Sequence, residues 1–178
     1  MTKNEETKTG EDLWNYTCNL YGEAEVEAAC LSLQNNYSAD VNVILFLCWL
    51  GSQEIFINNH KNLPSIVEVS RQWQKDIIEP LRHLRKQIGA MQGLDAKKVK
   101  SSLLRSELEA EKSEQLALLS LITPSQIDSA PTHSNAEKHK AVRQAIGIYF
   151  EIISDDASVR VDQACWVEID VILEGAFR

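Results

Sequence analysis

The sequence predicts an all-α protein, an irregular single-domain helical bundle of about seven helices around a buried central helix. Apolar side chains recur at spacings of three and four along most of the 178 residues, which is the period of a helix with one buried face. Residues 43–50 (VILFLCWL) are apolar on every side, as in a helix that other helices surround. The 44% hydrophobic and 25% charged content is that of a globular domain.

The N-terminal third is expected to hold a tail and three helices. Residues 1–10 are polar and acidic and predict a disordered tail, with the single helical domain covering residues 11–178. The first helix is expected from Asp12, a capping residue, to Tyr21, and the second over about 23–36. The central helix follows at about 39–50, with Gly51 as the expected end.

Two long helices are predicted in the middle of the chain. The first covers about 64–89, and Pro80 inside it lacks a backbone N–H and should kink the axis. The second covers about 95–122, roughly 40 Å at 1.5 Å per residue.

The C-terminal part begins with a predicted loop at about 123–133, which holds the two remaining prolines. Ser134 and Glu137 have the spacing of a capping box, so a helix is expected from there to about Ile153. Residues 156–176 fit either a helix or an alternating strand. Because no second strand exists to pair with them, the sequence favours a helix.

No catalytic, metal or cofactor motif is present. The chain lacks HExxH, Glu-x-x-His, CxxC and glycine-rich phosphate-loop patterns, so we expect no catalytic residue, no metal and no cofactor. This absence favours a non-enzyme without excluding an enzyme. Cys18, Cys30, Cys48 and Cys165 lie in apolar helical patterns and are expected to be small buried hydrophobic residues.

The charge and hydropathy of the chain limit its partners. A net charge of −8 opposes binding to nucleic acid, which needs a basic surface. The longest apolar run is far shorter than the about 20 residues of a membrane span, and the first residues do not resemble an export signal. We therefore expect a cytoplasmic protein with no nucleic-acid or membrane partner.

The charges are segregated along the chain. Residues 65–105 carry 9 Lys or Arg against 4 Asp or Glu, and Arg82 and Arg85 share a helix face. Two interpretations stay open: the arginines pair internally with Glu107 and Glu111, or they line a pocket for a phosphate or carboxylate. Asn42, at the edge of the apolar central helix, needs a partner such as one of these arginines or a glutamate of the helix over 95–122.

Several phrases carry a family resemblance. They are LW-x-Y at 13–16, V-x-x-ACL-x-LQ at 26–34, DVNV-x-LFLCWL at 40–50, PLR-x-LR at 80–85 and ELEAE at 107–111. Together they resemble an uncharacterised bacterial family of hypothetical proteins of unknown function over residues 13–122. The resemblance implies an all-helical fold and no known activity, and the chain departs from the pattern at 23–25, where a Pro-Gly pair is usual. The polar positions that match are Asp40, Asn42, Arg82, Arg85, Glu107 and Glu111.

These observations lead to two functional hypotheses. The first is a non-enzymatic adaptor or regulatory module that binds a protein partner or a second copy of itself through its long amphipathic helices. The alternative is a small-molecule binding protein or enzyme with an anionic ligand near Arg82 and Arg85. A deep pocket with either arginine in its wall would favour the alternative.

Overall fold

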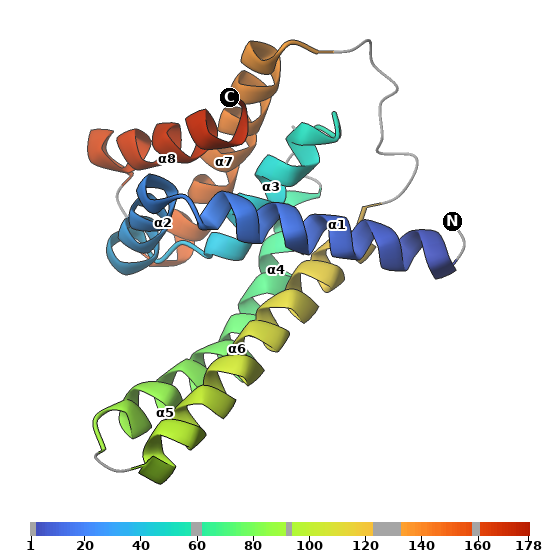
Figure 1. The fold of residues 1–178 in the computed structure, drawn as a ribbon. Coiled ribbons are helices and arrows are strands. Elements are labelled where there is room, and N and C mark those ends of the chain that lie inside the picture. The colour runs from blue at the N-terminus through green and yellow to red at the C-terminus, as the bar shows by residue number, and fades with distance from the viewer. Residues whose placement is uncertain (1–2, 58–61, 92–93, 123–132, 158–160) are drawn as a thin grey trace.

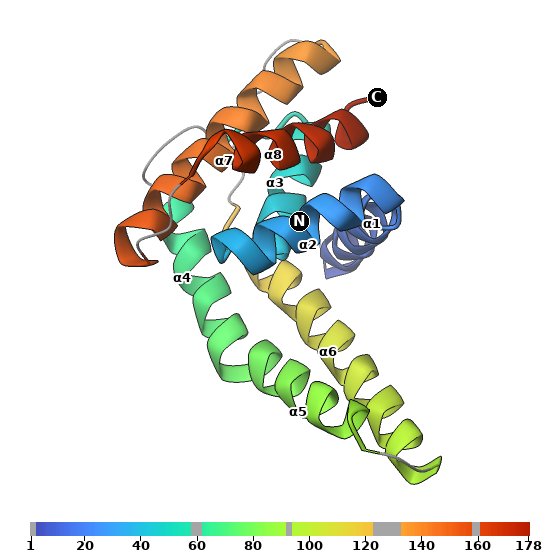
Figure 2. The same ribbon diagram turned by 90° about the vertical axis from the view of Figure 1, so that its left-hand side faces the viewer.

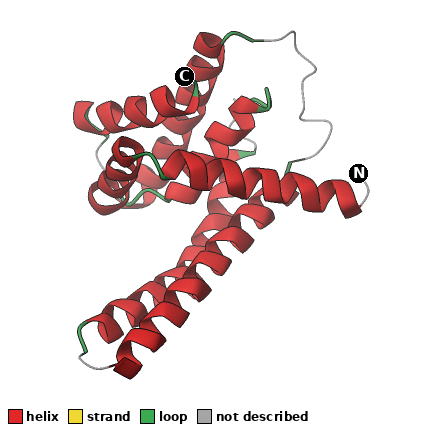
Figure 3. Cartoon of the chain, viewed as in Figure 1, coloured by secondary structure: helices red, strands yellow, loops and turns green. Residues whose placement is uncertain are grey.

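A computed structural model describes residues 3–57, 62–91, 94–122, 133–157 and 161–178, and this part of the chain contains helices but no strand (Figure 3). The predicted all-α class is confirmed. The elements are α1 (Lys3–Tyr21), α2 (Ala24–Tyr37), α3 (Val41–Ser52), α4 (Leu63–Trp73), the π-helical turn η1 (Gln74–Ile78), α5 (Glu79–Gly89), α6 (Leu94–Ser120), α7 (Asn135–Ala157) and α8 (Gln163–Ala176).

Helix α3 is the centre of the fold, as its apolar sequence predicts. Every residue from 42 to 51 is buried, and α3 contacts α1, α2, α4, α6, α7 and α8. Its N-cap is Asp40, whose carboxylate accepts a hydrogen bond from the backbone N–H of Asn42 at 2.9 Å. The helix therefore begins with a polar cap and continues as a rod with no solvent-exposed face.

Gly51 does not end α3, in contrast to the prediction, because the helix continues to Ser52. The glycine allows a close approach instead. A Cβ atom at position 51 would lie 2.2 Å from Val142 Cγ2 on α7 and 3.1 Å from the ring of Phe177. The absence of a side chain thus lets α7 and the C-terminus pack against the end of the central helix.

Helices α5 and α6 pair along their length and project from the rest of the molecule as a two-helix arm (Figure 1). The remaining helices form the body. Helix α4, η1 and α5 follow one another without a break, and their axis changes direction between α4 and α5 (Figure 2).

The predicted kink near Pro80 takes the form of a π-helical turn. The N–H of Glu79 donates to the carbonyl of Gln74, five residues back, immediately before the proline. A π turn widens the helix by one residue, which accommodates the proline ring and its missing donor. Pro80 therefore occupies the first turn of α5, where prolines are well tolerated.

The ends of several helices differ from the predictions. The chain is helical from Lys3, where a tail was predicted for residues 1–10, and Gly10 is buried so closely beneath Leu116 that a Cβ atom would lie 2.4 Å from it. The last helix starts at Gln163 rather than 156, because Asp162 caps it through the N–H of Cys165 at 2.9 Å. The capping box before α7 is confirmed: the backbone N–H of Ser134 donates to the Glu137 carboxylate at 2.8 Å, and the backbone N–H of Glu137 donates to Ser134 Oγ at 3.3 Å. The loop predicted at 123–133 lies outside the described residues except for its last one.

None of the helices in the described residues combines the length and the apolar character needed to cross a membrane.

We expect Gly51→Ala to lower the free energy of unfolding by about 1–3 kcal/mol, because the added methyl group overlaps Val142. Chemical denaturation monitored by circular dichroism measures the change. Gly89→Ala is the matched control, since its Cβ would meet only the flexible Lys100 chain at 3.5 Å. Equal stability of Gly51→Ala and wild type would contradict the close approach of α7 to α3.

Candidate functional site

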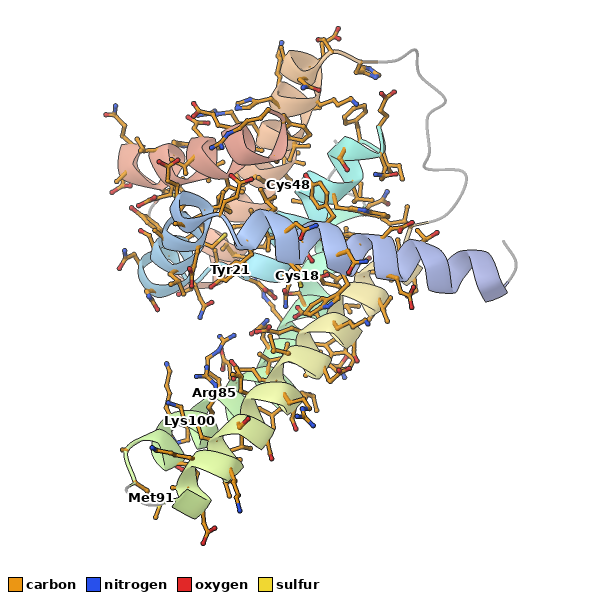
Figure 4. All side chains as sticks on the ribbon, in the orientation of Figure 1. Cys18, Tyr21, Cys48, Arg85, Met91 and Lys100 are labelled. Atoms are coloured by element: carbon orange, nitrogen blue, oxygen red, sulfur yellow. The ribbon has the colours of Figure 1, made fainter. Side chains whose placement is uncertain are left out.

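A cleft of about 980 Å³ lies where the arm meets the body. Its lining comes from α1, α2, the first residues of α3, the continuous α4–η1–α5 helix, α6 and α7. Figure 4 shows Cys18 and Tyr21 on the side of α1 that faces the arm, with Arg85 on the arm opposite them. The cleft is of the size of a small-molecule site, for which volumes of roughly 300–1,000 Å³ are usual.

Buried polar side chains concentrate at this cleft. Five of the six buried polar or charged residues in the described part of the chain belong to its lining, and the sixth hydrogen-bonds two lining residues. The six are Thr17, Asn42, Ser70, Glu107, Glu114 and Gln115. Because a buried polar group costs free energy unless it is paired, this concentration needs either a structural or a functional explanation.

Glu114 on α6 is the centre of the deeper cluster and has no solvent-exposed surface. Its Oε2 accepts hydrogen bonds from the side-chain amides of Asn42 at 2.6 Å and of Gln74 at 3.1 Å. Gln115 in turn donates to the Asn42 carbonyl oxygen at 3.3 Å and accepts from the Thr17 hydroxyl at 3.0 Å. One network therefore joins α1, α3, η1 and α6 beneath the cleft, and it supplies the glutamate partner that Asn42 was expected to need.

The Glu114 carboxyl is held in its neutral, protonated form. Burial is the largest cause, and the charge of Asp40 is the next; both raise the pKa of Glu114 well above its usual range. Its Oε1 has no donor from any described residue. A proton between Glu114 and Asp40 resolves this, since the protonated glutamate becomes a hydrogen-bond donor to the aspartate carboxylate.

Asp40 forms the surface of the same cluster and lines the cleft floor. Its Oδ1 accepts from the N–H of Asn42, and its Oδ2 accepts from the hydroxyl of Ser70. Its own backbone N–H donates to the hydroxyl oxygen of Tyr149 at 2.7 Å. Asp40 thus caps α3 and presents a half-buried carboxylate to the cleft.

A second polar cluster lies in the arm wall of the cleft. Arg82 donates from Nε to Glu107 at 2.8 Å and from Nη2 to Glu111 at 3.0 Å. Arg85 donates from Nε to Glu107 Oε2 and from Nη2 to Glu107 Oε1 at 3.1 Å, which makes a bidentate ion pair. Burial opposes ionisation of Glu107, but hydrogen bonds from Arg85 and Arg82 outweigh it and lower the pKa of that carboxyl. Burial raises the pKa of Glu111, against the pull of Arg82.

The six residues singled out from the sequence therefore fall into two clusters of one cleft. Asp40 and Asn42 lie at the floor, while Arg82, Arg85, Glu107 and Glu111 lie in the arm wall. Both arginines are paired, yet both line the cleft with a fifth to a quarter of the side chain exposed, at 20% and 25%. The two interpretations of the basic stretch, internal pairing and a pocket wall, thus both describe part of the arrangement.

Sequence reasoning missed Ser70, Gln74, Glu114 and Gln115. Glu107, Glu111 and Glu114 follow one another at spacings of four and three, so one face of α6 was marked as acidic, but that pattern is also typical of a solvent-exposed face. The prediction of four buried cysteines is wrong for Cys18, which is exposed and lines the cleft, whereas the other three are buried.

In the described part of the chain, no three His, Cys, Asp or Glu side chains gather closely enough to hold a metal ion.

A family model described as "Protein of unknown function (DUF2390)" matches residues 12–118. This range contains both clusters of the cleft, from Thr17 to Gln115. No curated protein and no solved structure matches the chain.

We expect Glu114→Gln to raise stability increasingly as the pH rises. A carboxyl whose folded pKa is raised above its unfolded value of 4.5 stabilises the fold fully only below that value, so the wild type loses stability through the neutral range. The amide keeps both roles, donating to Asp40 and accepting from Asn42. Thermal unfolding at about pH 5 and about pH 8 measures the difference, whose slope approaches about 1.4 kcal/mol per pH unit. A difference that does not grow with pH would contradict a neutral Glu114.

Glu107→Ala is expected to cost about 2–4 kcal/mol of unfolding free energy, because it removes the shared partner of two partly buried arginines. Glu109→Ala, an exposed position on the same helix, is the control and should change stability by less than about 0.5 kcal/mol. Denaturant titration compares the two variants. Similar small effects would show that the arginine cluster adds little to the fold.

Proposed function

We propose that this chain, which belongs to the family of proteins of unknown function DUF2390, binds a small molecule with an anionic group in the cleft between the arm and the body. The observation that carries the proposal is the pair of arginines in the cleft wall, each held in place by Glu107 and each with one donor nitrogen left over.

The spare donors are the Nη1 atoms. Arg82 and Arg85 use Nε and Nη2 for their bonds to the α6 glutamates, and within the described residues neither Nη1 has a protein partner. A guanidinium that is fixed through two of its nitrogens has little conformational freedom left to lose when a ligand binds. Two such groups side by side on one helix are well suited to a carboxylate or phosphate.

The charge of the cleft also supports an anion. Lys75, Arg82, Arg85 and Lys86 line it together with the acidic side chains of Asp40, Glu79, Glu107 and Glu111. The chain as a whole carries −8, so basic side chains are a larger share of the charged groups at the cleft than in the whole protein. A cluster of basic side chains attracts an anionic ligand to this part of the surface.

Replacement of either arginine by lysine tests this function. Arg82→Lys and Arg85→Lys keep a cation beside Glu107 but remove the planar fork and its spare donor. In a thermal-shift screen against anionic metabolites, we expect at least one compound to raise the melting temperature of wild type and to lose that effect in both variants. Arg105→Lys on the exposed face of α6, outside the cleft, should respond as wild type does.

Two results would count against the proposal. One is a screen in which no anionic compound stabilises the wild type. The other is a compound that stabilises the wild type and both cleft variants equally.

A second candidate is self-association through the arm. Ile77 in η1 and Leu84 in α5 are 42% and 47% exposed, and Met91, two residues beyond the end of α5, is 63% exposed. Together they form a row of exposed apolar side chains along the arm, and exposed apolar surface of this kind is typical of an interaction site. A second copy of the same arm offers a matching row.

We expect Leu84→Glu to abolish such self-association, because it places a charge in the centre of the row. Sedimentation velocity over a concentration series measures the mass of wild type and variant. Val167→Glu on α8, an equally exposed apolar position, is the control. A wild-type protein that stays monomeric at every concentration would rule out this candidate and leave the cleft proposal unaffected.

A further inference from the structure

We propose that the floor of the same cleft takes a basic nitrogen, so that the ligand is a zwitterion with an ammonium group at Asp40 and a carboxylate at Arg82 and Arg85. This inference rests on the proposed function, because it adds a second anchor to the anionic one.

Most of the polar side chains of the floor already donate a hydrogen bond within the protein. The amides of Asn42 and Gln74 donate to Glu114, and the Gln115 amide donates to Asn42. The Ser70 hydroxyl donates to Asp40. The floor therefore has few donors to offer an anion, and what it presents to the cleft is the carboxylate of Asp40.

The acceptors of the floor are less well satisfied. Each carboxylate has about four lone-pair sites, and the Asp40 carboxylate accepts from Asn42, Ser70 and the protonated Glu114, which leaves one site. None of the ion pairs found between described residues includes Asp40, whereas Glu107 and Glu111 are both paired. Directly behind Asp40, the fully buried Glu114 is neutral and donates to the aspartate, so the negative charge of this pair lies on Asp40 at the cleft. An ammonium group supplies donors and a positive charge to that carboxylate.

The two anchors belong to one cleft. Asp40 lines its floor, and Arg82 and Arg85 line its arm wall. The cleft volume of about 980 Å³ is that of a site for one small molecule. Apolar lining residues such as Leu45, Val67 and Leu108 suit a hydrocarbon segment between the two charged ends.

Straight-chain ω-amino acids, from aminobutanoate to aminooctanoate, are the test series, because one of them should match the separation of the anchors. Hexanoate and hexylamine are the controls with one charged end only. Binding is followed through Cys18, the one exposed cysteine in the described part of the chain, which lines the cleft. A bound ligand should slow its alkylation by iodoacetamide, and Cys18→Ser shows which part of the signal belongs to this thiol.

Asp40→Asn is the variant that separates the two anchors. Asparagine is as good a helix cap as aspartate, so α3 keeps its N-terminus while the negative charge is lost. We expect at least one ω-amino acid to protect Cys18 of the wild type at concentrations about 10-fold or more below those that hexanoate or hexylamine require. Asp40→Asn should remove that advantage.

Three other outcomes overturn the inference in distinguishable ways. Hexanoate binding as tightly as the best amino acid, with no effect of Asp40→Asn, would refute the ammonium anchor but keep the anion proposal. Hexylamine binding as tightly as the best amino acid would refute the anionic anchor at the arginines and, with it, the proposed function. If no compound of the series protects Cys18 while the anionic screen yields a ligand, the zwitterion alone is refuted.

Discussion

The burial of one carboxyl group, that of Glu114, constrains the rest of this structure. An ionised carboxylate with no solvent contact would cost several kcal/mol, so the group must be neutral, and its oxygens must be paired. The partners come from distant parts of the chain: Asn42 at the start of α3, Gln74 in the π turn and Asp40 at the α3 cap. Satisfying Glu114 therefore fixes where the arm leaves the body.

This constraint links the local irregularities of the fold to the cleft. The π turn before Pro80 contributes Gln74, a cleft residue whose side-chain amide reaches Glu114. On the arm side of the turn, Arg82 and Arg85 lie in the wall that faces the floor. A buried polar network of this kind adds specificity to packing more than it adds stability. The same arrangement leaves a hollow with a carboxylate at one end and two oriented guanidinium groups at the other.

The sequence predicts much of the fold but fewer of the residues that form the cleft. The apolar run 43–50 predicts the central helix because no other environment suits it, and Pro80 predicts a local irregularity because it lacks a donor. Internal pairing of the arginines and glutamates of the arm was one of the two interpretations that their charges left open. Glu114 and Ser70 could not be separated from exposed helical residues, because their burial depends on how the start of α3 packs on α4 and α6. The cleft is a property of that tertiary arrangement and leaves no periodic signal in the sequence.

The ionisation state of Glu114 tests this account most directly. Carbon-13 NMR of the glutamate side-chain carboxyls, recorded across the pH range and assigned with the spectrum of Glu114→Gln, reports the state of this group by itself. The account predicts a carboxyl resonance that stays at the protonated position through neutral pH. A Glu114 resonance that titrates near the ordinary value of 4.5 would show that the group meets solvent. A buried, neutral Glu114 would then not be what positions the arm on the body.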